Sequence, residues 1–134
     1  MHKGFIQTAA LLGALSIILG AFGAHALKEI FTADLLQVFE TAVRYQMYHA
    51  FALLAIGILY KEFSNKQIKL AGSFFITGVI LFSGSLYALC FIEYQHLSSL
   101  LWIGAITPLG GLCFIIGWLL LFAGTVKKRL VSAP

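Results

Sequence analysis

Polar side chains with the capacity for chemistry lie inside the apolar stretches of this 134-residue chain, where ionisable groups are costly. The central one is His49, because an imidazole can donate one hydrogen bond, accept another and carry a proton. Counting helix rise from Tyr60 places His49 about 16 Å into a hydrocarbon core about 30 Å thick. The candidate polar cluster that we expect in the outer half of the membrane is His49, Arg44, Glu40, Tyr45, Ser83, Tyr87 and His25.

These residues have a structural interpretation beside a functional one. A neutral imidazole commonly joins two membrane helices by hydrogen bonds, and Glu40 and Arg44, four residues apart, can pair at the membrane surface. Alternatively, His49 carries a proton that Tyr and Ser side chains relay, as in a small transporter. No Asp or Glu lies within the predicted spans, which weighs against transport by a buried carboxylate.

A haem or metal site shared by His25 and His49 is a third alternative. The same rise per residue separates their depths by about 15 Å, so one ion could not bind both without a large tilt. Cys90 and Cys113 lie in apolar stretches, with neither CxxC spacing nor a histidine at ligand spacing. A serine near His49 would still lack the third, orienting group of a hydrolase. We therefore predict no catalytic residue, no metal site and no cofactor.

The composition identifies the elements that position these residues. The chain is 60% hydrophobic and 10% charged, whereas soluble domains have roughly 45–50% and 25%. A soluble fold of this size could not bury so much apolar surface. A span needs about 20 helical residues, and the predicted spans are residues 4–24, 45–60, 68–92 and 108–126. We predict an all-α integral membrane protein, a four-transmembrane-helix bundle forming a single domain over residues 1–134.

Residues 32–44 are predicted to form an amphipathic helix that leads into the second span. Thr32 can cap its N-terminus, and Asp34 in the first turn suits the helix dipole. Its apolar residues fall on one stripe, and nothing breaks the chain before the span begins. We expect its outer part to lie at the membrane surface.

Two arrangements are open at the start of the fourth span. Pro108 is favoured at the first helical position, and Thr107 would then be its N-cap. In that case residues 97–106 form a lead-in against the bundle or the interface. The alternative is one longer helix kinked at Pro108.

The Lys and Arg residues predict the orientation. With the N-terminus inside, the cytoplasmic side holds Lys3, Lys61, Lys66, Lys69, Lys127, Lys128 and Arg129, and the outer side holds Lys28 and Arg44. This bias predicts that both termini are cytoplasmic, and it explains the net charge of +4 without nucleic acid. Cleavage of a signal peptide after Ala26 is the rival, but its apolar run would exceed the usual length of roughly 7–15 residues.

Small residues recur at intervals of about one heptad, which suits close helix packing in lipid. The glycines that we expect to pack helices together are Gly13, Gly20, Gly78, Gly84, Gly110, Gly117 and Gly124. Such packing leaves little room for a bulky buried ligand. The spacing does not decide whether these seams join helices of one chain or of two chains.

Several motifs along the chain carry a family resemblance. They are GAFGAHALK at residues 20–28, FETAVRYQMYHA at 39–50, FSGSLY at 82–87 and TPLGG at 107–111, followed by Gly117-Trp118. In this order they resemble the bacterial membrane family called domain of unknown function 423, which is related to animal transmembrane protein 256. The resemblance implies a small four-span protein of the bacterial inner (plasma) membrane. It transfers no catalytic residue, because no activity is established for the family.

The hypothesis that combines these features is a small inner-membrane protein that is a non-catalytic accessory or scaffold protein. Its expected partners are the lipid bilayer and a second copy or another membrane protein, with no nucleic acid. The alternative is a proton-coupled or small-ion transporter or channel that uses the polar cluster around His49.

Overall fold

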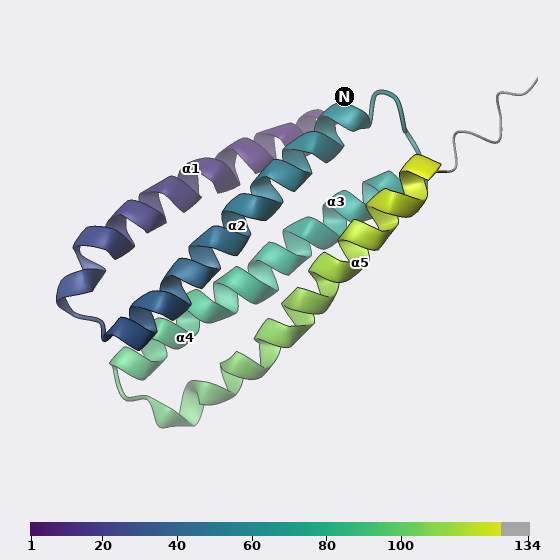
Figure 1. Ribbon diagram of the computed structural model, residues 1–134. Coiled ribbons are helices and arrows are strands. Elements are labelled where there is room, and N and C mark those ends of the chain that lie inside the picture. Colours follow the sequence, from purple (N-terminus) through teal and green to yellow (C-terminus); the bar gives the residue numbers. More distant parts are fainter. Residues whose placement is uncertain (127–134) are drawn as a thin grey trace, which may run out of the picture.

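The computed structural model describes residues 1–126 as a bundle of long helices, shown in Figure 1. The α-helices are α1 (Lys3–His25), α2 (Ala33–Leu59), α3 (Lys66–Gly78), α4 (Gly84–Tyr94) and α5 (Thr107–Val126). Shorter helical segments are η1 (Leu27–Glu29), the π-helical η2 (Val79–Ser83) and the 3₁₀-helical η3 (Ser98–Ile106). The predicted basic residues Lys127, Lys128 and Arg129 lie outside the described part.

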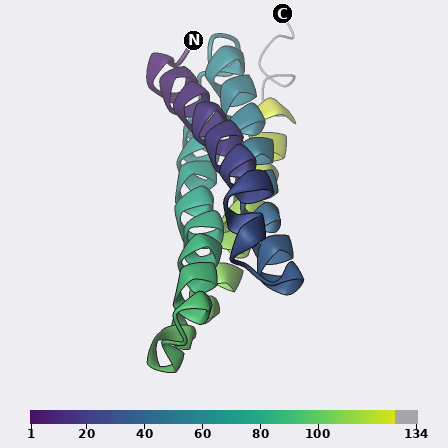
Figure 2. The same cartoon turned by 90° about the vertical axis from the view of Figure 1, so that its left-hand side faces the viewer.

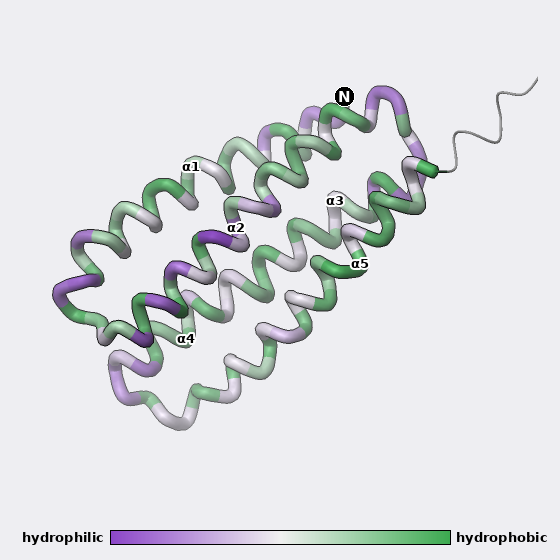
Figure 3. The backbone as a smooth tube through the Cα atoms, viewed as in Figure 1, coloured by the Kyte–Doolittle hydropathy of each residue, from purple (hydrophilic) through white to green (hydrophobic). Residues whose placement is uncertain are grey.

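Four continuous helical stretches are long and apolar enough to cross a membrane: Lys3–Glu29, Ala33–Leu59, Lys66–Tyr94 and Ser98–Val126. The predicted fold class is therefore confirmed. The amphipathic lead-in and the second span form the single helix α2, and the expected cap is present because Thr32 Oγ1 accepts from the Leu35 N–H at 3.3 Å. Figure 3 shows that α2 also carries hydrophilic residues along its middle.

The helices are arranged so that α2 is central. It packs against α1 on one side and against α3, η2 and α4 on the other, and α5 packs mainly against α3 and η2. Figures 1 and 2 show the N-terminus, the turn between α2 and α3 and the end of α5 at the same end of the bundle. There the His2 N–H donates to the Gly57 carbonyl and Asn65 Nδ2 donates to the Gly124 carbonyl, both at 2.8 Å.

Two apolar clusters fill the bundle, one towards each end. The larger joins α1, α2, α3 and α5, with Leu53, Ile56 and Phe75 fully buried at its centre. The smaller surrounds Phe39 and Cys90 near the opposite end. Large apolar side chains of α1 and α5 point outwards instead, which is the pattern expected of helices that face lipid rather than water.

The start of the fourth span matches neither predicted arrangement completely. Segment η3 runs directly into α5, so one continuous helical stretch changes from 3₁₀ to α geometry next to Pro108. The expected N-cap at Thr107 is wrong, because Thr107 already has helical backbone angles (φ −53°, ψ −48°). Its hydroxyl instead lies 2.6 Å from Ser85 Oγ of α4. No residue of Ser98–Ile106 is buried, so η3 covers the rim of the bundle.

Glycines permit the closest helix contacts within the chain. A methyl group at Gly78 would overlap the Phe114 ring, at Gly117 the Phe75 ring (2.5 Å) and at Gly124 the Ile68 side chain (2.7 Å). The closest approach is at Gly110, where the added carbon would overlap the backbone of Phe82 in η2. These seams therefore join helices of one chain.

Three of the predicted packing glycines behave differently. Gly20 faces Val43 at an ordinary contact distance of 3.5 Å, and a methyl group at Gly13 or Gly84 would meet nothing within 4 Å. Gly84 directly follows the π-helical turn, which shifts the helical register and leaves it exposed. Close contacts not foreseen from the sequence are at Gly57, against Ile6, and at Gly72, against Phe5.

We predict that Gly110→Ala lowers the stability of the bundle by about 1–3 kcal/mol, because the new methyl group meets backbone atoms that cannot rotate away. Gly13→Ala is the matched control, because its methyl group meets open space and alanine has the better helix propensity. Thermal unfolding of both variants in one detergent measures the difference. Equal stabilities would contradict the assigned contact between α5 and η2.

Candidate functional site

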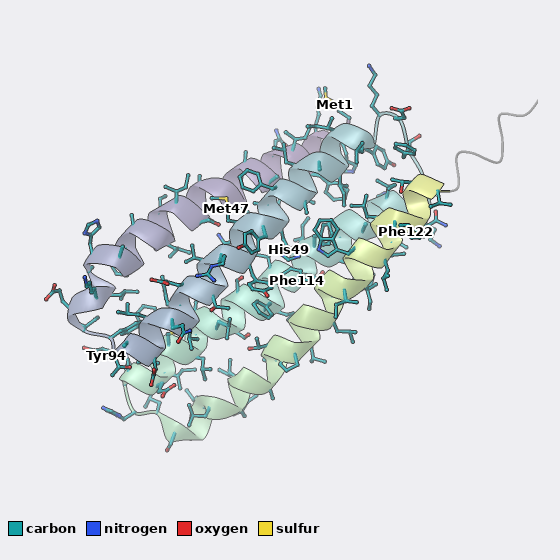
Figure 4. All side chains as sticks on the ribbon, viewed as in Figure 1. Met1, Met47, His49, Tyr94, Phe114 and Phe122 are labelled. Carbon is teal, nitrogen blue, oxygen red and sulfur yellow. The ribbon has the colours of Figure 1, made fainter. Side chains whose placement is uncertain are left out.

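His49 is the most enclosed ionisable side chain of the predicted cluster. It is only 4% exposed, and its side chain contacts residues of α3 and α5. Its ring stacks on Phe114 of α5, with the centroids 3.5 Å apart and the planes at 6°, and it meets the edge of Phe75 of α3. Figure 4 shows His49 and Phe114 together in the space between α2 and α5.

Both nitrogens of His49 have hydrogen-bond partners. Nδ1 lies 2.8 Å from the Tyr45 carbonyl, which can only accept, so Nδ1 carries the proton. Nε2 lies 3.3 Å from Trp118 Nε1, which can only donate, so Nε2 is the acceptor. The contacts thus assign the neutral Nδ1–H tautomer, with no nitrogen left for a metal or a mobile proton.

Gln46, one turn before His49, is the second buried polar side chain of α2 and was not among the predicted site residues. Its Nε2 donates to the Leu12 carbonyl of α1 at 3.0 Å, and its Oε1 accepts from the Tyr87 hydroxyl of α4 at 3.0 Å. Ser16 donates to the same Leu12 carbonyl at 2.8 Å. Gln46 therefore ties α1, α2 and α4 together at one level.

Two further hydroxyl contacts cross between helices. Ser83, at the end of the π-helical η2, donates to the Ala42 carbonyl of α2 at 2.7 Å. Ser85 of α4 bonds the Thr107 hydroxyl of α5 at 2.6 Å and donates to the Phe82 carbonyl one turn back. The interhelical polar network, defined as Ser16, Gln46, His49, Ser83, Ser85, Tyr87, Thr107 and Trp118, thus connects all four spans.

The structure brings only part of the predicted cluster together. Of its members, His49, Ser83 and Tyr87 belong to the interhelical polar network, but each bonds a different partner. Tyr45 is 39% exposed and packs its ring against Phe82 at 4.8 Å. The remaining three, Glu40, Arg44 and His25, are exposed.

The expected pairing of Glu40 with Arg44 is not formed among the described residues, although both line the same shallow groove beside Gly20. Their side chains are exposed on a helix surface, where an i, i+4 ion pair gains only a few tenths of a kcal/mol. His25 closes the last turn of α1.

The chemistry open to this arrangement is limited. Across residues 1–126, every buried side-chain nitrogen or oxygen has a hydrogen-bond partner. The same part of the chain holds no group of three or more His, Cys, Asp or Glu residues suited to a metal ion. A groove of about 610 Å³ opens between α2 and α5, and its walls include the rings of Tyr45, Phe82, Phe114 and Trp118. The polar side chains therefore hold helices together, and the open space beside them is aromatic.

The fold and the network define the class of this molecule: a polytopic α-helical membrane protein whose buried polar side chains, over residues 1–126, are hydrogen-bonded within the bundle. Residues 19–111 match the family described as "Protein of unknown function (DUF423)". The chain belongs to this family, as its motifs indicated.

Relatives share most of their length with this chain. A UPF0382 membrane protein of Staphylococcus saprophyticus is 44% identical over 93% of this chain and 98% of its own. The UPF0382 membrane protein YwdK of Bacillus subtilis is 41% identical over 93% and 98%. A UPF0382 membrane protein of Haemophilus influenzae is 39% identical over 96% of this chain and 98% of its own length. No solved structure matches. The chain is therefore similar throughout to bacterial membrane proteins of the same size.

We predict that Gln46 and Tyr87 are energetically coupled. Gln46→Leu and Tyr87→Phe each remove one side of the 3.0 Å hydrogen bond between α2 and α4. In a double-mutant cycle of unfolding free energies, we expect a coupling of about 0.5–2 kcal/mol. Pairing Gln46→Leu with Ser83→Ala, which bonds a different group of α2, is the control cycle. Strictly additive effects of Gln46 and Tyr87 would contradict the contact.

Proposed function

We propose that this protein is a non-catalytic accessory or scaffold protein of the bacterial inner membrane, whose buried polar residues serve assembly rather than transport. The observation that carries the proposal is the saturation of His49, whose two nitrogens bond the Tyr45 carbonyl and the Trp118 indole. A scaffold needs a rigid bundle with outward-facing surfaces, and the aromatic groove between α2 and α5 offers such a surface to a second copy or another membrane protein.

The transport alternative requires a proton carrier that can exchange with its neighbours. His49 would have to leave both partners and unstack from Phe114, and its hydrogen bonds do not continue to Ser83 or Tyr87. Those hydroxyls donate to other groups of α2, the Ala42 carbonyl and the Gln46 amide. A relay would therefore need rearrangement of at least two interhelical contacts for each proton.

We predict that the native protein in proteoliposomes passes protons and monovalent cations no faster than vesicles of lipid alone. His49→Ala should likewise give no flux but should lower the unfolding free energy by about 2 kcal/mol, because it removes one stacked ring and two hydrogen bonds. Flux in the native protein that His49→Ala abolishes without loss of stability would overturn the proposal in favour of proton transport.

We propose further that both termini face the cytoplasm. Lys3, Lys61, Lys66 and Lys69 lie at the end of the bundle that holds the N-terminus, whereas Lys28 lies at the other end. Cytoplasmic ends of membrane spans carry the excess of Lys and Arg. This distribution supports an N-in orientation, which an even number of spans extends to the C-terminus.

We predict that Ser98→Cys is labelled by a membrane-impermeant thiol reagent on intact cells and that Ser64→Cys is labelled only after permeabilisation. Both serines are exposed, one in η3 and one in the turn before α3, so the two variants sample opposite ends of the bundle. The native chain provides the background, because Cys90 and Cys113 lie within spans. The reverse labelling pattern would contradict the orientation while leaving the fold untouched.

A further inference from the structure

Arg44 is a charged residue within a membrane span, and its side chain has no partner among residues 1–126. It lies in the middle of α2, two residues before the bonded Gln46, yet it is exposed and its guanidinium makes no hydrogen bond or ion pair with any described residue. Counted from Tyr60, Arg44 is about 24 Å along the helix, so it lies within a hydrocarbon core about 30 Å thick, close to its boundary. A guanidinium at that depth needs an anion or water.

Glu40 lies one helical turn before Arg44, about 6 Å closer to the N-terminal end of α2. It is also exposed and also has no partner among residues 1–126. The two side chains border the same groove of about 250 Å³ between α1 and α2. The groove therefore presents a positive group on its deeper side and a negative group on its shallower side.

The rest of the groove is apolar, and α1 contributes only glycines to its walls. Its other walls are Gly20, Gly23, Phe39 and Val43. A carbon atom added at Gly20 would make an ordinary contact with Val43 at 3.5 Å, whereas one added at Gly23 would crowd the Phe39 ring at 3.0 Å, so the roomier part of the groove is the part beside Gly20. An apolar segment a few atoms wide fits this space between the helices.

These features match one kind of occupant that every membrane supplies. A phospholipid with a terminal ammonium group has acyl chains at the deepest level, then a phosphate, then a cation. Arginine binds phosphate oxygens through two parallel N–H groups, and a carboxylate pairs with an ammonium. Along α2, Arg44 lies deeper and Glu40 lies shallower. The two side chains therefore stand at the levels at which such a lipid carries its phosphate and its ammonium group.

We propose that the groove between α1 and α2 binds a phospholipid of the phosphatidylethanolamine type. Arg44 holds the phosphate, Glu40 holds the ammonium group, and the glycerol end of an acyl chain lies over Gly20. A purely anionic headgroup would bring no cation to Glu40. A second copy of the chain would need a far larger interface, of about 1,000 Å² or more, than this narrow groove provides.

The test is lipid binding by the purified full-length protein, measured by native mass spectrometry with equimolar dioleoyl phosphatidylethanolamine, phosphatidylcholine and phosphatidylglycerol. We expect phosphatidylethanolamine to bind about tenfold more tightly than either of the other two lipids. A tenfold ratio corresponds to the free energy of about one charge-assisted hydrogen bond. Arg44→Gln should remove bound lipid of every kind. Glu40→Gln should keep the lipid but equalise phosphatidylethanolamine and phosphatidylcholine.

Two more variants keep the result independent of folding. Gly20→Leu fills the groove without touching either charge and should also lose the lipid. Lys28→Gln removes an exposed cation outside the groove and should bind as the native protein does. The proposal would be overturned if the three lipids bound equally or if phosphatidylglycerol were preferred. It would also be overturned if Lys28→Gln lost as much bound lipid as Arg44→Gln. Cross-linking of two copies through Glu40 and Arg44 would overturn the proposal as well. None of these results would change the outcome of the flux experiment, so the lipid site and the proposed function are tested independently.

Discussion

Two buried polar side chains on α2, Gln46 and His49, face the constraint on which the rest of the bundle depends: lipid offers them no hydrogen-bond partner. Gln46 is satisfied by α1 and α4, and His49 by its own helix and by Trp118 of α5. Because these partners come from different helices, α2 must lie at the centre. The apolar residues of α1 and α5 cannot impose this order, since contact with lipid costs them nothing.

Close backbone approach reinforces the same arrangement. Gly110 of α5 admits the backbone of Phe82, and Gly78 admits Phe114, which in turn stacks on His49. The π-helical turn at Val79–Ser83 directs Ser83 to the Ala42 carbonyl. The interhelical hydrogen bonds and the close contacts at glycines therefore act on the same parts of the bundle, namely η2 and the aromatic rings around His49. The scaffold role that we propose rests on this fixed arrangement.

Much of the fold follows from the sequence, because span length and apolar content are local properties. The four spans, the continuous α2 and the cap at Thr32 were all predictable. The candidate site was predicted only in part, because the sequence does not show which helix faces meet. His49 could be singled out because it is ionisable within an apolar stretch. Gln46 is uncharged, and Trp118 was noted only as part of a family motif, so neither was predicted as a hydrogen-bond partner. The π-helical turn, which leaves Gly84 exposed, has no signature in the residues of η2.

The protonation state of His49 decides between a structural and a proton-carrying role, and the nitrogen chemical shifts of a selectively ¹⁵N-labelled protein in lipid bilayers would report it. We predict a protonated Nδ1 and an unprotonated Nε2 that correlates with the Trp118 indole proton, as the two contacts require. That result would support His49 as a link between helices. An Nε2–H tautomer, or an imidazolium with both nitrogens protonated, would contradict the assigned network and reopen proton transfer as the role of this residue.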